Sequence, residues 1–146
     1  MHTTRASLTS IIFLLFSSGP VSPVRSADPA ESLTGHYELV KKGRDVLSFD
    51  VLQVGKKVTL SFSAAHVDGS GAAPDGDGEG KVNTKGELEF KWTDTFDNAG
   101  TGNFHHEGKT YRLTLNTTKV TDARAMAFYG ERFLQRTSTK PQMSTR

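Results

Sequence analysis

The sequence of 146 residues contains no cysteine. This absence excludes disulfide bonds, thiolate nucleophiles and cysteine-ligated metals, so stability must come from packing or from a bound ion. Long apolar runs are missing too. The longest, Leu8 to Phe16, is too short for a membrane-spanning helix of roughly 20 residues. We therefore expect no membrane span.

The short apolar run near the start is typical of the core of an export signal. It follows Arg5 and is followed by the helix breakers Gly19 and Pro20 and by small residues up to Ser26. This order predicts a cleavable secretory signal peptide over residues 1–26. The mature protein is expected in the periplasm or outside the cell.

The charge balance gives little support to a nucleic-acid partner. The whole chain has 18 Lys and Arg against 16 Asp and Glu, and removal of Arg5 and Arg25 with the leader makes the two counts equal. Nucleic-acid binding needs a concentrated basic surface. The only sizeable basic cluster is Lys41, Lys42 and Arg44, which is typical of a solvated turn. No nucleic acid is expected as a partner.

After the leader, apolar and polar residues alternate as in strands with one buried face. The clearest windows are residues 57–65, 87–93 and 109–116, whose inward side chains should be Val58, Leu60, Phe62, Leu88, Phe90, Trp92, Tyr111, Leu113 and Leu115. Weaker strand windows lie at 34–42, 45–54, 79–84, 100–106 and 131–137. A helical turn or two is expected only within 122–130.

About eight strands joined by mostly short turns predict an all-β fold. We expect a small antiparallel up-and-down β-barrel formed by a single domain, residues 27–137, followed by a disordered tail at 138–146. A β-sandwich is the alternative. Turns of a meander alternate between its two ends, so the connections near Gly43 and at 68–80, 94–100 and 116–130 should gather at one end. Loops clustered on a rigid scaffold are common binding sites.

The longest glycine-rich connection, residues 68–80, reads DGSGAAPDGDGEG. Its residues Asp75, Asp77 and Glu79 alternate with glycines, so their carboxylates could converge on Ca²⁺. Further ligands could come from Asp68, or from Asp94, Asp97 and Asn98 if their loop lies at the same end of the barrel. Gly86 stands where an EF-hand needs its last Glu, so the loop is not an EF-hand. The competing interpretation is a solvated hinge whose Asp side chains accept hydrogen bonds from turn amides.

Catalytic patterns are weak throughout the chain. His105 and His106 are neighbours on an expected strand, so their side chains should face opposite ways and cannot share one zinc ion. The Gly-x-Ser-x-Gly pattern of a nucleophile elbow does not occur. We therefore expect no enzymatic activity and no required cofactor.

The exposed Ser70-Gly71 pair, set in a barrel of this size behind a cleavable leader, resembles the small periplasmic lysozyme inhibitors of Gram-negative bacteria. In that family a Ser-Gly-x-x-Tyr loop enters the cleft of the hydrolase. Here Pro74 occupies the Tyr position, and a second partial match, Thr34-Gly35-His36-Tyr37, has its Tyr one residue early. The resemblance implies partner contacts at Ser70, Gly71, Pro74 and Tyr37.

The sequence therefore leads to two functional hypotheses. One is a secreted or periplasmic binding protein without catalytic activity, such as an inhibitor of a lysozyme-like peptidoglycan hydrolase that acts through the 68–80 loop. The alternative is a calcium- or small-ligand-binding β-barrel with Asp68, Asp75, Asp77 and Glu79 as metal ligands.

Overall fold

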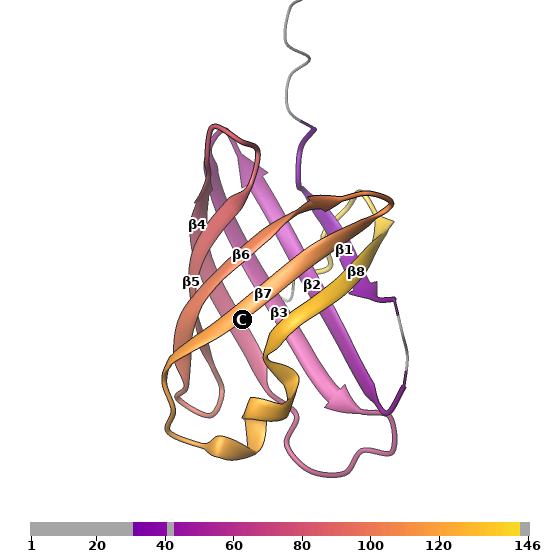
Figure 1. Ribbon diagram of the computed structural model, residues 1–146, viewed down its shortest axis with the longest axis vertical. Helices are drawn as coiled ribbons and strands as arrows, with labels where there is room; N and C mark the ends of the chain where they lie inside the picture. Colours follow the sequence, from indigo (N-terminus) through magenta and orange to yellow (C-terminus); the bar gives the residue numbers. More distant parts are fainter. Residues whose placement is uncertain (1–30, 41–42, 144–146) are drawn as a thin grey trace, which may run out of the picture.

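The computed structural model describes residues 31–40 and 43–143 and shows a β-barrel (Figure 1). The expected leader at 1–26 lies outside the described residues. The barrel consists of β1 (Gly35–Leu39), β2 (Asp45–Val54), β3 (Lys57–His66), β4 (Asp75–Val82), β5 (Leu88–Asp94), β6 (Ala99–Glu107), β7 (Thr110–Lys119) and β8 (Gly130–Ser138), with a short 3₁₀ helix, η1 (Ala123–Phe128), between β7 and β8.

The barrel is closed because β8 returns to pair with β1. Each strand is antiparallel to the next along the chain, and Tyr37 of β1 lies opposite Arg136 of β8. Closure leaves no unpaired sheet edge to attract another chain. The sequence-based prediction of an eight-stranded antiparallel barrel is confirmed, and the sandwich alternative is not adopted. No helix in the described part of the chain is long and apolar enough to span a membrane.

The connections differ in length between the two ends of the barrel (Figure 1). Tight turns at Gly55, Gly86 and Gly108 join β2 to β3, β4 to β5 and β6 to β7, and each of these glycines has a positive φ. The longer connections, including residues 67–74, 95–98 and 120–129, lie at the opposite end. The expected grouping of long loops at one end is confirmed.

Large side chains fill the interior of the barrel. The nine side chains expected to face inward are all buried, as are Tyr37, Phe49, Phe104 and Phe128. The rings of Tyr37 and Phe104 meet edge to face with centroids 4.8 Å apart, and Phe104 stacks on Tyr111. Burial of aromatic rings of this size provides the main stabilisation of a small barrel that lacks disulfides.

Inward-facing glycines on β4 and β6 make room for these rings. A Cβ atom at Gly76 would lie within 3.0 Å of ring carbons of Phe62, and one at Gly102 would lie within 3.0 Å of ring carbons of Phe90. The predicted 68–80 loop is therefore wrong beyond Pro74, because residues from Asp75 onward form β4. Gly76, which looks like a turn residue in the sequence, is the place where the ring of Phe62 packs against β4.

Side chains also close the end of the barrel that carries the tight turns. The guanidinium of Arg136 lies over the rings of Tyr37 and Tyr111, 5.3 Å from each centroid, and donates a 3.0 Å hydrogen bond to the Tyr37 hydroxyl. The same hydroxyl donates to the carbonyl of Leu33, which lies in the segment before β1. Burial raises the pKa of Tyr37 to about 12, although the Arg136 guanidinium acts in the opposite direction.

The opposite end is closed by η1 and the residue that follows it. Phe128 packs its ring against His66 at the end of β3, with centroids 4.8 Å apart. Tyr129 packs against Trp92 at 4.7 Å and against Phe62 at 6.0 Å. Segment 120–129 therefore covers the interior at the end where the long loops gather.

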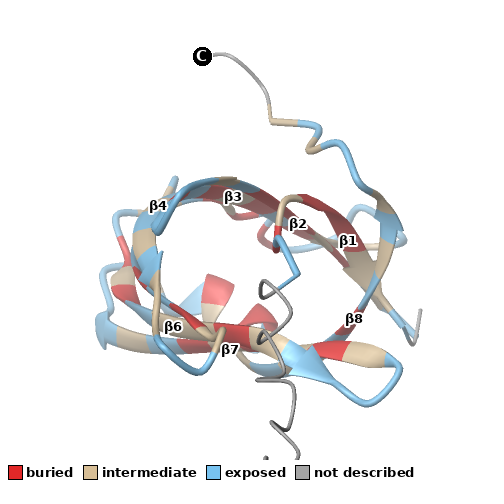
Figure 2. Ribbon diagram, turned by 90° about the horizontal axis from the view of Figure 1, so that it is seen from above, coloured by how far each residue is buried: buried red, intermediate tan, exposed pale blue. Residues whose placement is uncertain are grey.

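The chain after β8 contacts the outer face of the barrel. Ser138 belongs to β8, and residues 139–143 continue along the outside of the barrel (Figure 2). The backbone N–H of Gln142 donates a 2.6 Å hydrogen bond to the Asp50 carboxylate of β2. The segment predicted to be a disordered tail, residues 138–146, thus begins within β8 and contacts β2 at Gln142, which could not be seen in the local composition.

Candidate functional site

The 67–74 loop between β3 and β4 contains Ser70 and Gly71, and short hydrogen bonds brace its tip. The Asp68 carboxylate accepts hydrogen bonds from the backbone N–H of Ser70 at 3.0 Å and from its hydroxyl at 2.6 Å. Arg44 donates to the Ser70 hydroxyl oxygen at 2.7 Å and lies 3.6 Å from the Asp68 carboxylate. The hydrogen bonds from Ser70 hold the pKa of Asp68 below its usual value, and Arg44 acts in the same direction.

Both ends of this loop are anchored to the barrel. The N–H of Val67 donates to the carbonyl of Arg44 at 2.7 Å, and the N–H of Ala64 donates to the carbonyl of Pro74 at 2.9 Å. At the end of β3, His66 Nδ1 lies 2.7 Å from the carboxylate of Asp45 on β2. The loop is therefore held at its base and at its tip, which lowers the entropy that a binding partner would have to remove.

The residues that were expected to contact a partner differ in their exposure to solvent. Ser70 and Gly71 are exposed, and Val67 beside them is 65% exposed. Pro74 is buried at the base of the loop, and Tyr37 is 0% exposed inside the barrel. Tyr37 cannot touch a partner while the barrel is folded, so the expectation that it forms part of a contact surface is wrong. Pro74 shapes the loop but offers little contact area.

The expected calcium ligands lie along a strand instead of around a loop. Asp75, Asp77 and Glu79 occupy alternate positions of β4 on its outer side, while the glycines between them face inward. Side chains two residues apart on a strand are separated by roughly 6.6 Å, whereas Ca²⁺ ligands lie about 2.3–2.6 Å from the ion. No group of three or more acidic or histidine side chains suited to a metal ion occurs in the described part of the chain.

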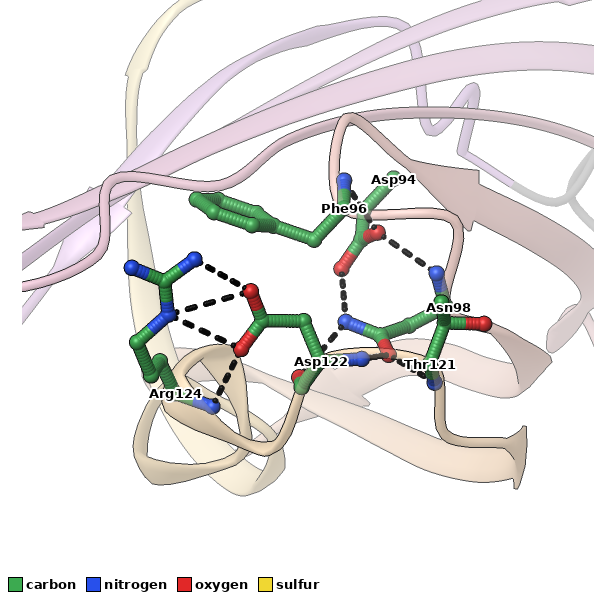
Figure 3. Close-up of polar contacts among 6 residues, drawn as sticks. All are labelled: Asp94, Phe96, Asn98, Thr121, Asp122 and Arg124. Atoms are coloured by element: carbon green, nitrogen blue, oxygen red, sulfur yellow. Dashed lines mark hydrogen bonds and ion pairs between the residues drawn. The ribbon is translucent and has the colours of Figure 1, made fainter.

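A second polar network, which the sequence did not indicate, ties the 95–98 connection to the start of η1 (Figure 3). Asn98 is fully buried and its side-chain amide donates to the Asp94 carboxylate at 2.9 Å. Its side-chain oxygen accepts from the backbone N–H groups of Thr121 and Asp122 at 2.7 and 2.9 Å. The Tyr129 hydroxyl donates to Asp94 Oδ2, the same carboxylate oxygen that accepts from the Asn98 amide. Asn98 therefore fixes two loops that are far apart in the sequence.

The electrostatics of this network follow from burial and from Arg124. Burial, and then the hydrogen bond to the Asp94 carboxylate, raise the pKa of Tyr129 above its usual value. Asp122 caps η1 by accepting from the backbone N–H of Arg124 at 2.9 Å, and the Arg124 guanidinium donates to the same carboxylate at 2.5 Å (Figure 3). These hydrogen bonds lower the pKa of Asp122 to about 2.

We expect a carboxyl titration followed by NMR to place the midpoint of Asp122 near pH 2 in the folded protein. Because the folded-state pKa lies below the unfolded value, the contribution of this contact is present above about pH 4 and is lost as the pH falls towards 2. Replacement of Arg124 by alanine should move the midpoint up towards 3.8. An unchanged midpoint in Arg124→Ala would show that Arg124 does not set it.

Comparison of the chain with protein-family models, with curated proteins and with solved structures found no significant match.

Proposed function

We propose that this chain is a secreted or periplasmic binding protein without catalytic activity of its own, which contacts a protein partner through the 67–74 loop. The observation that carries the proposal is the braced tip, where Arg44 and Asp68 hold an exposed Ser70 from two sides. Surface loops on a rigid scaffold are frequent binding sites, and a loop that is ordered before binding loses less entropy.

The filled interior favours this proposal over a small-ligand barrel. Trp92, Phe49 and Phe104 occupy the space in which a barrel of this size would hold a ligand, and side chains cover both ends. A ligand inside the barrel would have to displace these rings. A partner that binds at the end of the barrel with the long loops would not have to displace any of these rings.

The partner class that we propose is a lysozyme-like peptidoglycan hydrolase. Asp68 and Ser70 present a carboxylate and a hydroxyl group at the exposed tip, and hydrolases of this kind are often cationic. A cationic group of the partner would replace Arg44 beside the Asp68 carboxylate, and the Ser70 hydroxyl would exchange its bonds to Asp68 and Arg44 for hydrogen bonds within a polar cleft.

Replacement of Ser70 by lysine should abolish most of the inhibition of a c-type lysozyme, measured as lysis of a cell-wall suspension. The added side chain would repel a cationic enzyme and block close approach, so we expect the affinity to fall by at least about tenfold. Thr101→Lys is the matched control, because Thr101 is also exposed but lies on β6. Its affinity should stay within about twofold of the unchanged protein.

The loop assignment would be contradicted by equal loss of inhibition in the two lysine variants. Both variants should keep the melting temperature of the unchanged protein, since both sites are exposed. If the unchanged protein inhibits no lysozyme in a panel of c-type and related enzymes, the proposed partner class is wrong.

Calcium binding is tested separately by thermal melting of the mature protein with about 5 mM Ca²⁺, roughly five times a dissociation constant of about 1 mM, and with chelator. Because Asp75, Asp77 and Glu79 are spread along β4, we expect equal melting temperatures in the two conditions. A stabilisation that disappears in Asp77→Asn would contradict this expectation and would favour the calcium-binding alternative.

A further inference from the structure

A polar groove lies on the outer face of β1 to β4, away from the tip of the 67–74 loop. Four side chains form one row across neighbouring strands, since His36 pairs with Asp50, Asp50 with Ser61 and Ser61 with Asp77. Together with Ser63 and Asp75, which lie in the adjacent row, they line a hollow of about 300 Å³. We call this surface the acidic groove, because its described lining contains three carboxylates and neither lysine nor arginine.

The floor of the acidic groove contains a buried pair of side chains. His36 Nδ1 lies 2.8 Å from the Asp50 carboxylate, and each side chain is only 9% exposed. On its other side, His36 Nε2 lies 3.8 Å from the Glu38 carboxylate. A carboxylate as buried as that of Asp50 needs hydrogen-bond donors, and His36 alone does not supply all of them.

The further donor comes from a segment that is not part of the sheet. The C-terminal tail passes outside the wall formed by β1, β2 and β3 (Figure 2). There the backbone N–H of Gln142 donates to the same Asp50 oxygen that faces His36, and Gln142 itself forms part of the lining of the groove. The acidic groove therefore already holds a segment of this chain outside the sheet through one main-chain hydrogen bond.

We propose that the acidic groove binds an extended basic segment of another polypeptide, and that the C-terminal tail of this chain competes for the same place. The main-chain donor to Asp50 can be supplied by any peptide, and the exposed carboxylate of Asp77 selects lysine or arginine side chains by charge. The oxygens of the serine hydroxyls can accept hydrogen bonds from the remaining ammonium or guanidinium N–H groups. This site is separate from the partner contact proposed for the 67–74 loop.

The competition is tested with a fluorescein-labelled, C-terminally amidated tetralysine peptide, whose binding is followed by fluorescence anisotropy at low salt. Gln142→Pro removes the backbone N–H that holds the tail, whereas Gln142→Ala keeps it. Loss of one main-chain hydrogen bond from the competing tail should make Gln142→Pro bind the peptide about threefold to tenfold more tightly. Gln142→Ala should bind it as the unchanged protein does.

The selection by charge is tested with Asp77→Asn, for which Glu89→Gln on the exposed side of β5 is the matched control. Removal of one carboxylate that contacts an ammonium group should weaken binding by about fivefold in Asp77→Asn only. Added salt should weaken the binding of the unchanged protein, because it screens these exposed charges.

Three results would overturn the proposal. The first is that Gln142→Pro does not bind the peptide at millimolar concentration. The second is that Gln142→Pro and Gln142→Ala bind the peptide with equal affinity. The third is that Asp77→Asn and Glu89→Gln weaken peptide binding to the same extent. Ser70→Lys should leave peptide binding within about twofold of its original value, because Ser70 lies outside the groove. Each of the two proposed binding sites can therefore be disproved without affecting the other.

Discussion

Valine in place of Gly102 is expected to destabilise the barrel by about 3 kcal/mol or more. Gly102 faces the barrel interior from β6, and a Cβ there would lie within 3.0 Å of three ring carbons of Phe90. The backbone of β6 cannot move away, because it pairs with β5 on one side and with β7 on the other. The change is measured by urea denaturation of the mature protein.

A second substitution can show that the clash with Phe90 is the cause. Phe90→Leu removes the outer ring carbons that a side chain at position 102 would meet, so the double variant should be less destabilised than the sum of the two single variants. Gly43→Val is the matched control, since Gly43 is exposed and a Cβ atom there would have no heavy atom within 4 Å. Equal losses at positions 43 and 102 would contradict the packing argument.

Alanine in place of Asn98 should lower the free energy of unfolding by about 3 kcal/mol, because two backbone N–H groups lose a buried acceptor. These are the N–H groups of Thr121 and Asp122, which donate to the Asn98 side-chain oxygen. The Asp94 carboxylate also loses the side-chain amide as a donor. We expect the loss in thermal and urea unfolding alike.

Two further variants define the contribution of Asn98. Asn98→Asp keeps the size of the side chain but places a carboxylate against that of Asp94, so it should also be destabilising at neutral pH. Asn116→Ala, on the exposed side of β7, should change stability by less than about 0.5 kcal/mol. If Asn98→Ala is no worse than Asn116→Ala, the network in Figure 3 does not hold the two loops together.

The strands could be predicted because alternation of apolar and polar residues reports a buried face directly. In β3, β5 and β7 every second side chain enters the core, so the pattern alone indicated both the element and its inward residues. The tight turns at Gly55 and Gly86 then determined which connections share an end. Together these features were enough to indicate an antiparallel barrel.

The start of β4 could not be predicted from its own residues. Glycine and aspartate are both depleted in strands, so residues 75–80 look like a turn. They form a strand because Phe62 and Leu60, on the neighbouring β3, fill the space that side chains at positions 76 and 78 would need. Such compensation across a sheet depends on register, which local composition does not contain.

The candidate site could be predicted only in part, because several of its contacts join residues that are far apart in the sequence. Ser70 and Gly71 were found from a local pattern, and both are exposed. Arg44, which braces Ser70, is 26 residues away, and Asn98 bonds to backbone groups more than 20 residues away. Tyr37 was chosen from a partial motif match with its Tyr one residue early, and its position on the inward face of β1 buries it.

The most direct test of the proposed function is an NMR map of backbone amides in the isotopically labelled mature protein with an equimolar c-type lysozyme. The proposal predicts that the amides of residues 67–74 and of Arg44 change most, while those of β5 to β7 keep their positions. Changes that are confined to other surfaces, or the absence of any change, would contradict the assignment of the braced loop as the contact with a lysozyme-like hydrolase.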